Sequence, residues 1–154
     1  MFTRTIVLTT VAAAVGLGFM GIVAGPAAFD WYDGRHEEAS SYVTGATAKE
    51  DRTSVPRWLP DAAKDVSYVM TTTGGDRLLK ATLPADGLPA TCEPVKAATT
   101  PGKPALEASW FPKGTSDKAG YRCDLYYAYT DGHTLYAWQQ EEDWISSNKS
   151  AASR

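Results

Sequence analysis

The sequence predicts an N-terminal transmembrane helix followed by a small α+β domain, mostly antiparallel β, that lies outside the cytoplasm and holds one disulfide. Three observations carry this prediction. Residues 5–29 contain no charged side chain, two pairs of β-like segments flank tight-turn signals, and two cysteines stand in the polar part of the chain. A chain of 154 residues has room for one modest domain after the apolar segment.

Residues 5–29 are long enough to cross a hydrocarbon core of ~30 Å as a helix that rises ~1.5 Å per residue. Arg4 precedes this segment and acidic residues follow it, so the positive-inside rule favours residues 1–4 in the cytoplasm and the domain outside the cell membrane. A cleaved secretory signal ending near Gly25-Pro26-Ala27 is the alternative, and it predicts a secreted domain. The absence of a cysteine near the end of the segment argues against a lipid anchor.

One face of the expected membrane helix carries only small side chains. Ala14, Gly18, Gly21 and Gly25 follow the i, i+4, i+7, i+11 spacing of a helical stripe. Such a stripe lets a second membrane helix approach closely. The alternative is that alanine and glycine are simply common in membrane segments.

The chain after the membrane segment divides by composition into three parts. Residues 30–54 are polar and weakly patterned, so we expect a spacer, whereas residues 55–145 carry the apolar and aromatic side chains of a β-rich domain. Residues 146–154 are expected to be a disordered tail.

About five strands and one or two short helical turns are expected within this domain. Residues 66–73 and 77–83 flank Gly74-Gly75-Asp76, and residues 122–130 and 134–139 flank Asp131-Gly132, which predicts two hairpins. A short strand is expected at 106–111.

Two cysteines can pair in only one way, and outside the cytoplasm we expect Cys92 and Cys123 to form a disulfide. It would join the proline-rich loop at 84–104 to the start of the last hairpin. In the chain-entropy description, a loop of this length contributes about 3–4 kcal/mol to stability.

Charge and composition narrow the functional classes. The formal net charge of −3 offers no footprint for nucleic acid, and no cluster of His, Cys, Asp or Glu has metal-ligand spacing, so no cofactor or metal is expected. His36 and His133 fall in a linker and a turn, and Glu141 to Asp143 form a solvated acidic run. No catalytic constellation is apparent. The carboxylates available to an enzyme, none marked out as a pair, are Asp61, Asp65, Asp76, Asp124 and Asp131.

Aromatic side chains are the remaining unusual feature. Most of them are expected to fill the core, because each ring buries a large apolar area. The functional alternative is that Tyr126, Tyr136 and Trp138 lie exposed on the face opposite Cys123 and form a binding platform.

Five short motifs follow one another along the chain: Trp58-Leu59-Pro60, Leu88-Pro89-Ala90-Thr91-Cys92, Trp110-Phe111-Pro112, Cys123 and Tyr136-Ala137-Trp138. This pattern, over residues 55–139, resembles a group of uncharacterised short membrane-anchored proteins of actinobacteria. The resemblance implies an anchored extracytoplasmic domain and no known activity.

Together these observations favour a membrane-anchored accessory or binding module that recognises a partner protein or a cell-envelope polymer. Two alternatives stay open. One is a structural subunit of a membrane complex that packs through the small-residue face, and the other is an envelope enzyme that uses carboxylates.

Overall fold

The structure is a computed structural model in which residues 36–84 and 88–154 are described. The expected membrane segment at 5–29, with its face of Ala14, Gly18, Gly21 and Gly25, lies outside the described residues. No helix among those that are described is long and apolar enough to cross a membrane.

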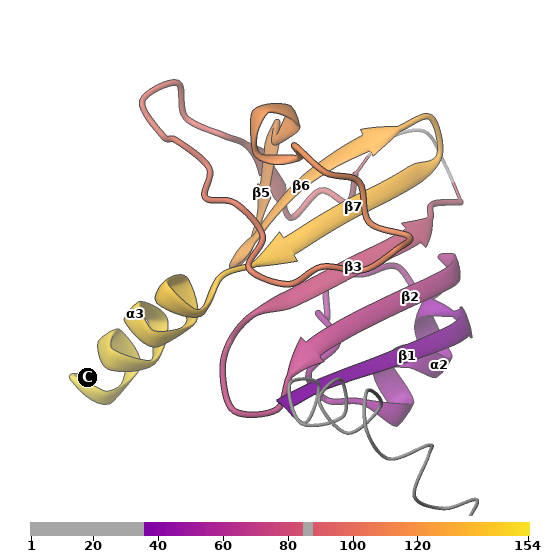
Figure 1. The fold of residues 1–154 in the computed structure, drawn as a ribbon, viewed down its shortest axis with the longest axis horizontal. Helices are drawn as coiled ribbons and strands as arrows, with labels where there is room; N and C mark the ends of the chain where they lie inside the picture. The colour runs from indigo at the N-terminus through magenta and orange to yellow at the C-terminus, as the bar shows by residue number, and fades with distance from the viewer. Residues whose placement is uncertain (1–35, 85–87) are drawn as a thin grey trace, which may run out of the picture. The chain divides into compact units, whose positions relative to one another are not determined.

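The described residues form a seven-stranded sheet in which every neighbouring pair of strands is antiparallel (Figure 1). The order across the sheet is β1-β2-β3-β7-β6-β5-β4. Its strands are β1 (Glu37–Thr44), β2 (Lys64–Thr71), β3 (Arg77–Thr82), β4 (Cys92–Pro94), β5 (Tyr121–Cys123), β6 (Tyr126–Asp131) and β7 (Thr134–Gln139). The helices are α2 (Gly45–Asp51) and α3 (Glu141–Ala152), with a 3-10 turn, η2 (Ser116–Lys118).

Both predicted hairpins form. β2 pairs with β3 and β6 pairs with β7, and Gly132 occupies the left-handed region at φ 58° that the tight Asp131-Gly132 turn requires. The disulfide between Cys92 and Cys123 also forms, and it joins β4 to β5 at directly opposite positions.

Each face of the sheet carries its own apolar cluster. The first, called here the helix-covered face, packs Tyr68, Leu79, Leu135 and their neighbours against α2 and the segment 52–60. The second, called the loop-covered face, packs its aromatic side chains beneath residues 95–119. The alternating strand residues therefore bury both sides of the central strands.

The prediction of a spacer at 30–54 is wrong for the described residues, since β1 and α2 lie within this range. The sequence of β1 shows little alternation of apolar and polar residues, because β1 lies at the sheet margin, where few of its side chains are buried. Polar contacts hold it instead: Glu38 pairs with Arg52 at 2.6 Å, and the Tyr42 hydroxyl donates to Asp51 at 2.7 Å. The domain therefore begins before residue 55.

Three other expectations need correction. Residues 106–111 form no strand, because their apolar side chains cover the sheet instead of joining it. Seven strands form instead of about five, since β1 and β4 arise in segments expected to be spacer and loop, and the strand expected at 122–130 is divided into β5 and β6. Most of the expected tail belongs to α3, where Asp76 accepts a hydrogen bond from the Glu141 backbone N–H at 3.0 Å.

Candidate functional site

The loop-covered face is built by residues 95–119, called here the covering loop, which crosses β7 and β3 in front of the sheet (Figure 1). Side chains of β7 and the residue after it hold this loop in place. The Trp138 indole N–H donates to the Gly102 carbonyl at 2.9 Å, and the Gln140 side chain donates to the Lys103 carbonyl at 3.0 Å. The covering loop therefore has a fixed position on the sheet, although most of it lacks regular secondary structure.

Aromatic rings fill the space between the covering loop and the sheet. Phe111 is their hub, because its ring meets the rings of Trp110, Tyr136 and Trp138 edge-on at centroid distances of 5.9, 5.8 and 6.3 Å. Edge-to-face pairs at such distances are favourable beyond the area they bury. The rings fix one another's orientation and make a rigid floor.

A row of three side chains crosses the sheet beside this hub. Lys80 on β3 lies opposite Tyr136 on β7, and Tyr136 lies opposite Tyr129 on β6. The two tyrosine rings stack at 5.2 Å with an interplanar angle of 22°. This arrangement follows from strand register, since directly opposite residues in an antiparallel pair share a face.

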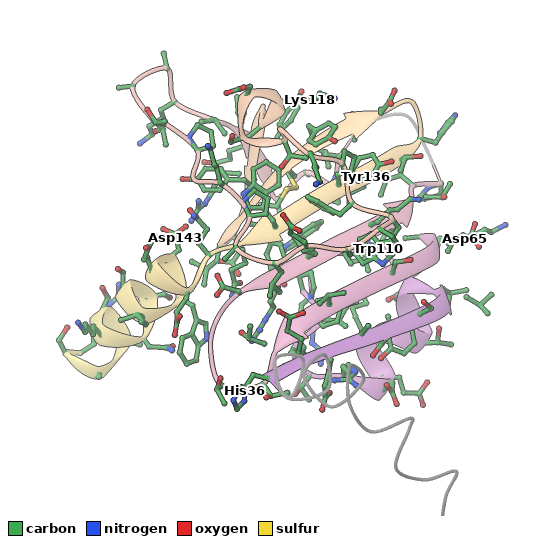
Figure 2. All side chains as sticks on the ribbon, viewed as in Figure 1. His36, Asp65, Trp110, Lys118, Tyr136 and Asp143 are labelled. Atoms are coloured by element: carbon green, nitrogen blue, oxygen red, sulfur yellow. A yellow bond between two sulfur atoms is a disulfide. The ribbon has the colours of Figure 1, made fainter. Side chains whose placement is uncertain are left out.

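Lysines flank the stacked tyrosines on both sides. The Lys80 ammonium lies 6.0 Å from the Tyr136 ring centre, and the Lys118 ammonium lies 5.6 Å from that of Tyr129. Both distances allow a cation–π attraction. Figure 2 shows Trp110, Lys118 and Tyr136 reaching this face from the covering loop, η2 and β7.

A hollow of about 460 Å³ opens within the covering loop next to the aromatic hub. Leu106 and Phe111 supply its buried apolar floor, and the exposed side chains of Lys103 and Lys113 stand at its rim, with Glu107 as the one carboxylate lining it. Its size falls within the usual range for small-molecule sites, roughly 300–1,000 Å³. An apolar floor with a charged rim suits a ligand that is partly apolar and carries charge.

The cationic side chains of this face form no ion pair with a carboxylate of the described residues, Glu107 at the hollow included. Lys80, Lys103, Lys113 and Lys118 form no ion pair with any residue in 36–84 or 88–154, whereas Lys49 pairs with Asp61 at 2.6 Å elsewhere. A ligand that brings negative charge would therefore meet four available ammonium groups on one face.

Burial raises the pKa of Tyr129 above its ordinary value of 10.0, and the neighbouring phenol of Tyr136 and carboxylate of Asp131 act in the same direction. The hydroxyl of Tyr129 is thus neutral at physiological pH. Within the described part of the chain it has no hydrogen-bond partner.

The expected platform of Tyr126, Tyr136 and Trp138 does not form as an exposed surface. Trp138 is fully buried and Tyr126 is 3% exposed, while Tyr136 is half-buried on the loop-covered face. Tyr126 instead shares the helix-covered face with Cys123, because the turn at Asp124, whose φ is 56°, separates β5 from β6 and shifts the alternation by one position. Tyr136 contributes to the candidate site directly and Trp138 supports it from beneath, whereas Tyr126 lies on the other face.

The carboxylates considered for an enzyme lie apart. Asp61 pairs with Lys49, and Asp76 caps α3. Asp65 on β2 and Asp131 on β6 are separated by β3 and β7, which is three strand spacings or roughly 14 Å.

Among the described residues, no group of three or more His, Cys, Asp or Glu side chains could hold a metal ion. His36 lies just before β1, and His133 lies in the last hairpin turn. The acidic run at 141–143 begins α3, where carboxylates favour the positive end of the helix dipole, and its Asp143 pairs with Arg122 at 3.1 Å.

Lys80, Lys103, Lys113 and Lys118 were not singled out by the sequence, and Trp110 was named only within the Trp110-Phe111-Pro112 motif. One signal was available, because pairing 77–83 with 134–139 places Lys80 beside Tyr136 once the register is known. The other four belong to the covering loop, whose path no periodicity describes.

Comparison of the chain with protein-family models, with curated proteins and with solved structures finds no match. The resemblance to short membrane-anchored proteins of actinobacteria therefore stays a prediction.

Proposed function

We propose that this chain is a membrane-anchored extracytoplasmic binding module that recognises an anionic cell-envelope polymer through its loop-covered face. The observation that carries the proposal is the hollow of about 460 Å³, with its apolar floor and its rim of unpaired lysines. Concave sites with apolar walls and a few polar groups are the usual places where proteins bind ligands.

Rigidity supports a binding role. The rings of Trp110, Phe111 and Trp138 pack edge-on, and hydrogen bonds from β7 fix the backbone of the covering loop. A site that is ordered before its ligand arrives loses less conformational entropy on binding.

Charge favours an anionic ligand. The chain is acidic overall, with a formal net charge of −3, yet four lysines without carboxylate partners gather on this face. Their attraction for a polyanion is screened by salt, so binding should weaken as ionic strength rises.

Sedimentation with washed, insoluble envelope polymer tests the proposal on the full chain in mild detergent. Lys103→Glu combined with Lys113→Glu should weaken binding about tenfold, because each rim charge contributes roughly 0.5–1 kcal/mol. Lys149→Glu combined with Arg154→Glu makes the same change in charge at the exposed C-terminal end and should leave binding intact.

Equal losses in the two double variants would mean that only overall charge matters and would remove the site from the proposal. Failure of the unmodified chain to sediment with the polymer, together with stoichiometric capture of an envelope protein, would replace the polymer with a protein partner.

A further inference from the structure

The two margins of the sheet differ in how well they are protected. β4 has three residues, includes Pro94, which lacks an N–H group, and is covalently tied to β5. β1 has eight residues, contains neither proline nor glycine, and keeps one register along β2 from Glu37↔Thr71 to Thr44↔Lys64. In the described part of the chain no strand lies on its outer side, as the lower margin of the sheet in Figure 1 shows.

An open strand margin presents backbone N–H and C=O groups to which another strand can bind. β1 is also held firmly, because Arg52 pairs with Glu38 and Tyr42 donates to Asp51. Its most exposed apolar side chain is Val43, at 77%. The margin is therefore long, straight and ordered before a partner arrives.

The distribution of charge along β1 selects the direction of pairing. Glu37 and Glu38 occupy one end, while the other end, Tyr42 to Thr44, is uncharged and lies beside Lys64. Parallel pairing of two copies would stack glutamates on glutamates, which is unfavourable. Antiparallel pairing places the glutamates of each copy beside the uncharged end of the other.

The side chains select the register. With Ser41 opposite Ser41, Val43 meets Ala39 and Tyr42 meets Ser40, so each large side chain faces a small one. Glu38 then lies opposite Thr44 of the second copy, whose neighbour on β2 is Lys64. The two strand spacings between Glu38 and that lysine, roughly 10 Å, can be spanned by the two side chains.

We propose that two copies of this chain pair β1 with β1, antiparallel and centred on Ser41, so that their sheets join into one. The two-fold relation closes the assembly at two copies, because each copy uses the one long open margin of its described strands. Pairing at this margin requires no ligand on the loop-covered face.

Cysteine cross-linking of the full chain in mild detergent tests the register directly. Ser41→Cys adds one free thiol to a chain whose described cysteines are joined, and mild oxidation should convert most of this variant to a covalent dimer. Thr53→Cys places an exposed thiol outside β1, in the segment that follows α2, and should stay monomeric on a non-reducing gel.

A second variant separates this contact from any other. Adding Val43→Glu to Ser41→Cys places a carboxylate diagonally across from Glu37 of the second copy at both symmetric contacts, and this repulsion should lower the initial cross-linking rate several-fold. Val43 packs little in one copy, so circular dichroism should be unchanged. Equal cross-linking of the Ser41 and Thr53 variants, or a rate insensitive to Val43→Glu, would overturn the proposal.

Discussion

Trp138 links the stability of the sheet to the shape of the candidate site. Its ring is fully buried between Phe111 and Tyr127, and its indole N–H binds the Gly102 carbonyl at 2.9 Å. One side chain on β7 thus supports both the aromatic floor and the backbone of the covering loop.

Trp138→Phe should lower the free energy of unfolding by about 2–4 kcal/mol, because it removes a partly buried hydrogen bond and part of a large buried ring. Hydrogen exchange should show faster exchange around Gly102 than around β2. Trp144→Phe, on the partly exposed face of α3, is the matched control and should change stability little. Unchanged protection near Gly102 would mean that other contacts hold the loop.

Buried tyrosines give the molecule an alkaline limit. Burial raises the pKa of Tyr68 and Tyr129, and raises that of Tyr126 well above 10.0. Below about pH 10 these phenols are neutral in the folded and unfolded states. Above that pH the unfolded chain ionises first, so stability should fall as pH rises toward the folded-state values.

Tyr126→Phe should reduce this alkaline loss of stability, measured by urea unfolding at a series of pH values. At neutral pH the change should cost less than about 1 kcal/mol, because the Tyr126 hydroxyl lies beside the Tyr68 hydroxyl, which donates to the Ser54 carbonyl, and makes no hydrogen bond of good geometry within the described residues. Tyr121→Phe, at an exposed position, should leave the pH profile unaltered. A large destabilisation by Tyr126→Phe at neutral pH would contradict this account.

At the scale of elements, α3 depends on contacts near its first turn. Asp76 accepts from the Glu141 N–H, Arg122 pairs with Asp143, and Gly75 lies so close to Trp144 that an added Cβ would meet the Trp144 Cβ at 2.5 Å. None of the side chains of α3 is buried. The helix is therefore joined to the sheet mainly by its N-terminal end.

Asp76→Ala should cost about 1 kcal/mol and shift hydrogen exchange of α3 toward that of an unprotected helix. Asp117→Ala removes an exposed carboxylate that caps no helix, and should leave α3 unchanged. Protection of α3 that survives the loss of Asp76 would show that Arg122 and Trp144 suffice.

The elements differ in how clearly the sequence predicts them. Strong alternation and a turn signal predict the β2–β3 and β6–β7 hairpins, whose side chains are buried on both faces. β1 and α3 escape prediction because neither buries a full apolar stripe. The strand expected at 106–111 is wrong because an apolar run indicates only that its side chains are buried. It does not distinguish a strand from a loop that packs on a sheet.

The candidate site is harder to predict than the strands. Tyr136 is found as an aromatic residue at a β position, but its burial depends on the covering loop, and the lysines at the rim belong to that loop. The face of Tyr126 depends on a single turn at Asp124. Such long-range and single-residue effects leave no periodic trace in the sequence.

For the whole molecule, the disulfide stabilises the margin farthest from β1. Cys92 and Cys123 are separated by 31 positions, and β4 has only three residues to pair with β5. Cys92→Ser with Cys123→Ser should lower the free energy of unfolding by about 3 kcal/mol. Urea unfolding measures this loss, and reduction of the unmodified protein should reproduce it; a loss below about 1 kcal/mol would mean that the open chain already restrains this loop.

The position of β1 also determines how the domain would respond to tension. A pull on the N-terminal end of β1, against a ligand held on the loop-covered face, would peel β1 from β2 and stretch the Glu37–Thr71 end first. The hydrogen bonds between β1 and β2 would then break one after another, because each in turn would carry the whole force. We expect an optical-tweezers experiment to record detachment of β1 at low force while the disulfide-linked margin stays folded, and simultaneous rupture of the whole sheet would refute this.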